Sequence, residues 1–359
     1  MKPLLFVTGH APAYRVGALA RLHEREGIVV ALFGGRAKHG GEVFEGEMPF
    51  PHLHVRPPQL ARLAASGEYR AVVCPTGGRI APAAAWAGAR AARVPLILWA
   101  SLWAHPRTLA HAFTYLPLRR LYASADAVVT YGEHVSAYVR ARGARNVFVA
   151  AQSVDNDFWR GAPAEPEPQG APALPWPAHA TTRFLFVGRS AREKGLDVLL
   201  GAWRASDLAR AGAALAVVGD GARASAAALT RAGAMSAVEL RRTYAVADVL
   251  VVPSIATRTF REPWGLVVNE AMNCSTAIIA SDAVGAAAGG LVRDGSTGIV
   301  VRAGDSADLG RAMRLLAQDA ELRSRYALAG ADAVLDYSHD AWARGFSEAL
   351  AALGRSRGR

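Results

Sequence analysis

The sequence predicts an α/β protein of two successive domains, each built on a parallel sheet, with a cleft between them. Short apolar, β-branched runs alternate twice along the chain with amphipathic stretches rich in Ala, Arg and Leu. This is how strands and helices alternate in βαβ units. A stretch with six prolines in 17 residues, 161–177, separates the two alternating regions. At 359 residues the chain is long enough for two hydrophobic cores.

The first region predicts a Rossmann-like domain over residues 1–160. Its expected strands are residues 4–7, 29–33, 71–74, 96–99, 127–130 and 147–149. Helical periodicity is expected at residues 16–26, 82–92, 109–123 and 134–142.

After a proline-rich linker, 161–178, the same alternation predicts a second Rossmann-like domain over residues 179–337. Its expected strands are residues 184–187, 215–218, 249–252 and 277–280, and its later helices are 309–318 and 321–334. Because the carboxyl ends of parallel strands share one edge, the loops after these strands form a ligand edge. A last helix within residues 338–359 can pack back onto the first domain.

Two cations follow the first strand of the second domain. Gly188 ends that strand, and Arg189 and Lys194 come next, five residues apart. A glycine lets the backbone approach a ligand, and a guanidinium with an ammonium group suits two phosphoryl groups. Lys194 is one of only three lysines among 41 basic residues, which favours a specific role over that of a solvated cation at a turn.

Two carboxylates, Glu262 and Glu270, flank a helix start. Pro263 and Gly265 lie between them and prevent one continuous helix, so we expect Glu262 on a loop and a helix from about Gly265. Amide N–H groups at the amino end of that helix would face the ligand edge. These amides belong to Gly265, Leu266 and Val267. The alternative is that both glutamates are ordinary surface residues.

The order of these motifs resembles that of the retaining GT-B glycosyltransferases of family 4. The motifs run FVGR-x4-KG, VGDG, AD-x-x-V-x-P-S, E-P-W-G-L-V-x-N-E-A-M and a D-G-x-x-G turn, within residues 184–301. The first half resembles the family through WASLWAHP, VVTYGEHV and SVDNDFW. The resemblance implies the GT-B fold and transfer of a sugar from a UDP- or GDP-type nucleotide sugar, with retention and without a metal or other cofactor.

The resemblance also implies a role for each residue. Arg189 and Lys194 would hold the donor diphosphate, Glu262 would bind a hydroxyl of the donor sugar, and Glu270 would bind the ribose. The remaining donor contacts would come from Gly188, Gly219, Gly265, Leu266 and Val267. The first domain would bind the acceptor, which could be a glycan, a lipid-linked molecule or a small molecule.

The first half offers two further candidates. His105, in WASLWAHP, would face the donor sugar or the acceptor, or would be a structural histidine. Arg15 follows the first strand, where the family has a glycine-rich loop over the phosphates; there Arg15 or His10 would contribute, or the segment is a plain connecting loop.

The chain departs from the family in three places. The double glycine of the first loop is missing, and Ser275 replaces a usual glycine after the Glu270 helix. The base-pocket region after Gly221 is short, and Gly233 and Met235 are the candidates there. The triplet Asp155, Asn156 and Asp157 could hold a metal, but its place before the linker favours a turn.

Composition restricts the partners and the location. The net charge is +11, but the arginines are scattered and not interleaved with aromatic residues, so we expect no nucleic acid partner. A solvated surface and contact with anionic lipid headgroups both remain open. Two cysteines cannot build a disulfide framework, and no apolar stretch is long enough for a membrane span. We expect a cytoplasmic protein, with a peripheral position at the inner membrane face as an alternative.

Three rival functions share some of these features. A glycoside hydrolase could use Glu262 and Glu270 as its carboxylate pair, but Arg189 and Lys194 would then have no purpose. A sugar-nucleotide epimerase would use the same fold. A catalytically degenerate subunit that binds a sugar nucleotide would explain Ser275 and the missing glycines.

Overall fold

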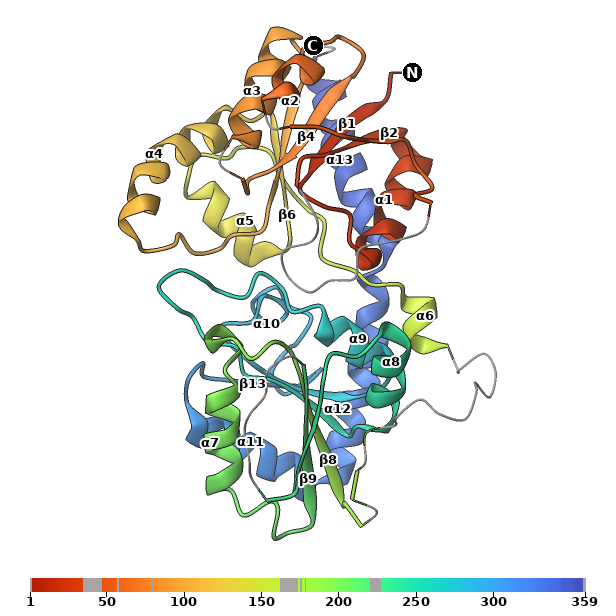
Figure 1. The fold of residues 1–359 in the computed structure, drawn as a ribbon, viewed down its shortest axis with the longest axis vertical. Helices are drawn as coiled ribbons and strands as arrows, with labels where there is room; N and C mark the ends of the chain where they lie inside the picture. The colour runs from red at the N-terminus through yellow and green to blue at the C-terminus, as the bar shows by residue number, and fades with distance from the viewer. Residues whose placement is uncertain are drawn as a thin grey trace. The chain divides into compact units, whose positions relative to one another are not determined.

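The computed structural model describes residues 2–34, 47–56, 58–78, 80–161, 174, 176–177, 179–219 and 227–357. The chain divides into two compact units, Met1–Asp155 with Ser338–Arg359, and Asn156–Tyr337. Each unit contains one sheet (Figure 1). Most of the proline-rich linker and the last two residues of VGDG lie outside the described residues.

The first unit holds a seven-stranded sheet in the order β3-β2-β1-β4-β5-β6-β7, and every neighbouring pair is parallel. Its strands are β1 (Leu4–Thr8), β2 (Ile28–Leu32), β3 (His52–His54), β4 (Ala71–Pro75), β5 (Leu96–Ala100), β6 (Ala127–Thr130) and β7 (Val147–Val149). The order reverses between β1 and β4, which makes the sheet Rossmann-like with one added strand.

Helices cover both faces of this sheet. They are α1 (Ala13–Glu26), α2 (Gln59–Ala64), α3 (Ala81–Ala91), α4 (Leu109–Ser124), α5 (Glu133–Arg140) and the C-terminal α13 (His339–Arg357). Helices α1 and α13 contact each other and share one core with Phe6 and Trp99, whereas α2 to α5 share the opposite core with Leu5 and Val7 (Figure 1). Alternate strand residues thus point to opposite faces, as the pleat requires.

The second unit holds a six-stranded parallel sheet in the order β10-β9-β8-β11-β12-β13. Its strands are β8 (Thr182–Val187), β9 (Ala213–Val218), β10 (Leu229–Ala232), β11 (Val249–Val252), β12 (Ala277–Ser281) and β13 (Ile299–Val301). Its helices are α6 (Asn156–Arg160), α7 (Leu196–Ala205), α8 (Ala237–Val246), α9 (Val267–Asn273), α10 (Gly285–Ala288), α11 (Ser306–Gln318) and α12 (Ala320–Ala333), with 3-10 turns η1 (Arg192–Lys194) and η2 (Val334–Asp336).

The predicted fold class, α/β with two Rossmann-like domains, is therefore confirmed. Three short strands, β3, β10 and β13, were not expected from the sequence. Cys74 and Cys274 are both free thiols. Among the described residues, no helix combines the length and the apolar character that crossing a bilayer requires.

Candidate functional site

Two glycines lie at the carboxyl ends of the neighbouring strands β8 and β9 of the second sheet. The N–H of Gly188, directly after β8, donates to the carbonyl of Val218 at 3.0 Å. Gly219 has a φ of +143°, and a Cβ atom there would lie 1.9 Å from the carbonyl oxygen of Gly188. The backbones of the two strand ends therefore approach so closely that only glycine fits at position 219.

The next glycine fixes the position of Lys194, the last residue of η1. Gly195 has a φ of +71°, and a Cβ atom there would lie 1.9 Å from the carbonyl oxygen of Pro253, after β11. The N–H of Ile255 donates to the carbonyl of Glu193 at 2.9 Å. The loops after β8 and β11 are therefore joined, and Lys194 stands between them on a firmly held backbone.

Lys194 and Glu262 form an ion pair, with Nζ 2.5 Å from Oε2. Their side chains are 23% and 10% exposed. The backbone of Glu262 is held by a parallel bridge to Val284 and accepts from the N–H of Gly285 at 3.1 Å. Arg189 is more open, with its guanidinium 3.5 Å from Glu193 and 42% exposed. The structure thus brings two predicted residues together in a contact that sequence reasoning missed.

Helix α9 begins at Val267, two residues later than expected. Gly265 has a φ of +93° just before it, and the buried indole N–H of Trp264 donates to Asn269 at 2.7 Å. This indole contact ties the loop to the helix. The N–H groups of Gly265, Leu266 and Val267 lie at the amino end of α9, where the helix dipole favours anions.

Glu270, on α9, is half-buried and accepts a hydrogen bond from the hydroxyl of Tyr244 on α8 at 2.9 Å. Burial raises the pKa of Glu270 to about 7, although the Tyr244 hydrogen bond opposes this shift. Burial and the neighbouring carboxylate also raise the pKa of Tyr244 well above its ordinary value. Tyr244 is a site residue that sequence reasoning missed, because no motif includes it.

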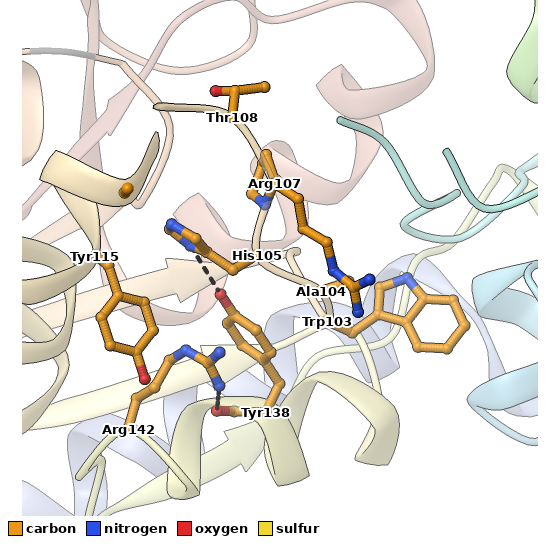
Figure 2. A pocket seen from close by; sticks show the side chains of 10 residues that line it. Trp103, Ala104, His105, Arg107, Thr108, Tyr115, Tyr138 and Arg142 are labelled. Carbon is orange, nitrogen blue, oxygen red and sulfur yellow. Dashed lines mark hydrogen bonds between the residues drawn. The ribbon is translucent and has the colours of Figure 1, made fainter. Parts of the chain in front are cut away.

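In the first unit, His105 lines a pocket of about 690 Å³ (Figure 2). Its Nε2 atom is 2.8 Å from the carbonyl oxygen of His111, and the hydroxyl of Tyr138 is 3.5 Å from its Nδ1 atom. The guanidinium of Arg142 lies 3.5 Å from the centre of the Tyr138 ring. The pocket lining consists of Trp103, Ala104, His105, Pro106, Arg107, Thr108, Ala112, Tyr115, Tyr138 and Arg142. It contains cations and aromatic rings but no carboxylate among the residues that the structure describes.

Arg15 is only 6% exposed and lies in an aromatic setting near the start of α1. Its guanidinium carbon lies 5.0 Å from the ring centre of Trp99 and 5.6 Å from that of Trp342, and Nη2 donates to Gln152. These packing contacts account for the burial of Arg15. A role of Arg15 in binding the donor phosphates stays a prediction. His10 is exposed.

The remaining candidates lie apart from these groups. Met235 accepts a contact from the Thr243 hydroxyl at 3.5 Å, and Gly233 faces open space. Asn156, of the acidic triplet, accepts a hydrogen bond from Asn273 at 2.9 Å. Across the described residues, no three His, Cys, Asp or Glu side chains come together as a metal site would require.

Comparison with known proteins places this geometry in a family. Residues 181–319 match the family model described as glycosyl transferases group 1. This segment is similar to that family. It contains the loop with Arg189 and Lys194, the Glu262 loop and Glu270 on α9, so the family match covers all four of these candidate residues.

Two curated relatives share part of the chain. A phosphatidyl-myo-inositol mannosyltransferase of Mycobacterium leprae is 43% identical over 91 residues, 25% of this chain and 23% of that protein. A D-inositol 3-phosphate glycosyltransferase of Stackebrandtia nassauensis is 37% identical over 108 residues, 29% of this chain and 22% of that protein. The matched part of the chain thus spans less than a quarter of either relative's length.

Solved structures match the fold over nearly the whole chain. Anabaena Alr3699/HepE, in complex with UDP and glucose, superposes with a TM-score of 0.74, at 18% identity and over 98% of this chain and 100% of that chain. A glycosyltransferase from Rickettsia africae gives a TM-score of 0.75 at 14% identity, over 98% of each chain. The chain therefore has the GT-B fold of the glycosyltransferases.

Proposed function

We propose that the protein transfers a sugar from a nucleotide-diphosphate sugar, of the UDP or GDP type, to an acceptor bound by the first unit. The observation that carries the proposal is that Lys194 pairs with Glu262, and that Arg189, Lys194, Glu262 and Glu270 all follow β8 or β11, the two strands between which the order of the second sheet reverses. Ligands of open parallel sheets bind at such points. The family match over residues 181–319 supports this function, as does the UDP named for the Anabaena structure.

The proposed chemistry needs no metal. When the bond between the anomeric carbon and the diphosphate breaks, negative charge develops on the diphosphate, and Arg189 with Lys194 stabilises that charge. The acceptor oxygen attacks the same face of the sugar and passes its proton to the leaving diphosphate, so the configuration is retained. Glu262 would bind a sugar hydroxyl, and Glu270 the ribose hydroxyls. The amides of Gly265, Leu266 and Val267 would contact the sugar and the phosphates.

The ion pair between Lys194 and Glu262 adds a step to this proposal. In the structure Lys194 and Glu262 satisfy each other's charge in a largely buried place. An arriving diphosphate competes with Glu262 for Lys194, which releases a carboxylate oxygen for a sugar hydroxyl. We infer that the two contacts form together, so that the diphosphate and the sugar are recognised as one unit.

For the acceptor we propose only a chemical class and no single compound. The name of one curated relative contains phosphatidyl-myo-inositol and the name of the other contains D-inositol 3-phosphate. A glycan, a lipid-linked molecule or a small molecule therefore remains in view, with His105 at the pocket of the first unit. We include an anionic membrane surface among the proposed partners of the protein, and we propose no nucleic acid partner.

Mutation of the two cations tests the function. Arg189→Ala and Lys194→Ala are expected to lower turnover by at least about a hundredfold, because each removes charge stabilisation from the leaving group. Arg192→Ala is the matched control, since Arg192 is an exposed cation in the same loop and is expected to keep near-normal turnover. Transfer is measured by mass spectrometry of acceptor and nucleotide products, with UDP- and GDP-sugars as donors.

The products also separate the rival functions. Release of nucleoside diphosphate that depends on an acceptor supports transfer. A changed sugar still attached to its nucleotide would instead indicate an epimerase, and hydrolysis of a glycoside without any nucleotide would indicate a hydrolase. Tight nucleotide binding without turnover on any acceptor would leave a degenerate binding subunit.

A further inference from the structure

The first half of α4 presents an unusual apolar surface. Leu109 is 85% exposed, Phe113 is 83% exposed and Leu116 is 59% exposed. Positions i, i+4 and i+7 lie on one face of a helix, so these three side chains form a continuous stripe. Single exposed apolar residues are common on protein surfaces, but a stripe of three large ones marks an interaction site. We call these three residues the α4 stripe.

The surroundings of the α4 stripe are basic. Between Tyr69 and Ala125 the sequence contains seven arginines and no Asp or Glu. Five of these arginines are exposed, two on the C-terminal half of α4 itself. They are Arg90, Arg93, Arg107, Arg119 and Arg120. An exposed apolar helix face, in a stretch of sequence whose charged residues are all arginines, is complementary to a surface with anionic headgroups over an apolar interior.

The end of α4 is anchored to the rest of the unit, whereas the stripe is not buried. The indole N–H of Trp86, on α3, donates to the hydroxyl of Ser124 at 3.1 Å, and Arg90 donates to the Ser124 carbonyl at 2.5 Å. Tyr122, near the same end, is fully buried. The C-terminal turn of α4 is therefore held by α3, while the three side chains of the stripe, in its N-terminal half, stay exposed to solvent; Figure 1 shows where α4 lies in the first unit.

We propose that the α4 stripe and its arginines dock the protein on the surface of a membrane that contains anionic lipids. A second copy of the chain fits less well, because a twofold contact would bring the same arginines face to face. The pocket lined by His105 includes Thr108, Ala112 and Tyr115, which are also spaced at i, i+4 and i+7 and lie one position away from the stripe around α4. Docking would therefore place this pocket beside the lipid headgroups.

Vesicle binding tests the proposal without any donor or activity, so its outcome is independent of the proposed function. The full chain is mixed with vesicles of phosphatidylcholine, or of phosphatidylcholine with phosphatidylglycerol, and the bound fraction is measured by flotation. We expect binding to the anionic vesicles that weakens as salt is added. The double variants Leu109→Ser with Phe113→Ser, and Arg119→Gln with Arg120→Gln, are each expected to weaken binding by about tenfold or more.

The matched control is Leu328→Ser with Arg325→Gln, which removes one exposed leucine and one exposed arginine from α12 of the second unit and is expected to bind as the original chain does. Equal binding to neutral and anionic vesicles, or binding that the α4 variants do not change, would overturn the proposal. Analytical ultracentrifugation gives the other decisive result. A dimer that Phe113→Ser dissociates, without vesicle binding, would assign the stripe to a second copy.

Discussion

Glu270 combines an acidic side chain with a poorly solvated position, and its pKa is raised to about 7. Its carboxylate must be ionised to accept hydrogen bonds well from ribose hydroxyls. We therefore predict that affinity for a nucleotide sugar rises by up to about ninefold between pH 6 and pH 8, as the ionised fraction grows from about a tenth to about nine-tenths. Titration calorimetry with a UDP- or GDP-sugar measures this, because its diphosphate does not titrate in that range.

The variant Glu270→Gln supplies the control. It is expected to bind more weakly at pH 8 and to lose most of the pH dependence, since its amide does not ionise. Stability changes in the opposite direction. Because the folded state raises the pKa of Glu270, its contribution to stability falls as pH increases from about 4.5 through 7. The variant should therefore unfold at a higher temperature than the original chain at pH 8. A steep pH dependence that survives in Glu270→Gln would contradict the assignment.

The sequence predicts which residues belong to the candidate site better than it predicts which residues they contact. The sequence motifs indicated Lys194, Glu262 and Glu270, but the ion pair joins positions 68 residues apart and the Tyr244 contact joins positions 26 residues apart. The first pairing depends on how the loops after β8 and β11 meet and the second on how α8 packs against α9, and residue types at fixed spacing specify neither. Gly195 is the exception in hindsight, because a lone glycine before a helix indicates a close backbone approach.

At the scale of elements, the turn between α9 and β12 carries strain. Ser275 has a φ of +55°, in the left-handed region where side chains cost about 1–2 kcal/mol. The glycine expected there by family resemblance would relieve this cost, although its greater freedom when unfolded takes back about 0.5–1 kcal/mol. We predict that Ser275→Gly stabilises the second unit by up to about 1 kcal/mol. Differential scanning calorimetry should show a melting temperature higher by about 2–4 °C.

Ser296→Gly, elsewhere in the second unit, is the matched control for Ser275→Gly. Ser296 is exposed and does not have a positive φ. The control should lower stability slightly, by about 0.5 kcal/mol, since glycine there gains no relief. A melting temperature that falls in both variants would show that Ser275 is not strained. If Ser275→Gly has the same activity as the original chain, Ser275 no longer supports the alternative of a catalytically degenerate subunit.

Most strands could be predicted from the sequence, the edge strand β7 included, but the edge strands β3, β10 and β13 could not. Strands β6, β7 and β11 match their predicted bounds, because each is an apolar run beside a turn. Strand β3 reads His-Leu-His and β10 reads Leu-Thr-Arg-Ala, and both lie at a sheet edge with one neighbour. An edge strand is covered less, so selection for continuous apolar residues is weaker there. Pairing with β2 or β9, and not local pattern, defines these segments.

At the scale of the whole molecule, the first unit is assembled from the two ends of the chain. Trp342 of α13 is fully buried, with its ring 5.7 Å from that of Trp99 and 4.6 Å from that of Phe346. This aromatic core joins the C-terminal helix to Trp99 of β5, 243 residues earlier in the chain. Residues 338–357 are therefore part of the core of the first unit and not an appendage of the second.

This division predicts two thermal transitions that respond to different changes. A bound nucleotide sugar should raise only the transition of the second unit, because ligand stabilises the part that binds it. Trp342→Ala should lower the other transition, at a cost of about 3–5 kcal/mol. Trp203→Ala is the matched variant, since Trp203 is 2% exposed in the core of the second unit beside Phe184, and it should lower the ligand-sensitive transition. Calorimetry with and without ligand distinguishes these outcomes, and a single transition that both variants lower equally would show that the units unfold as one.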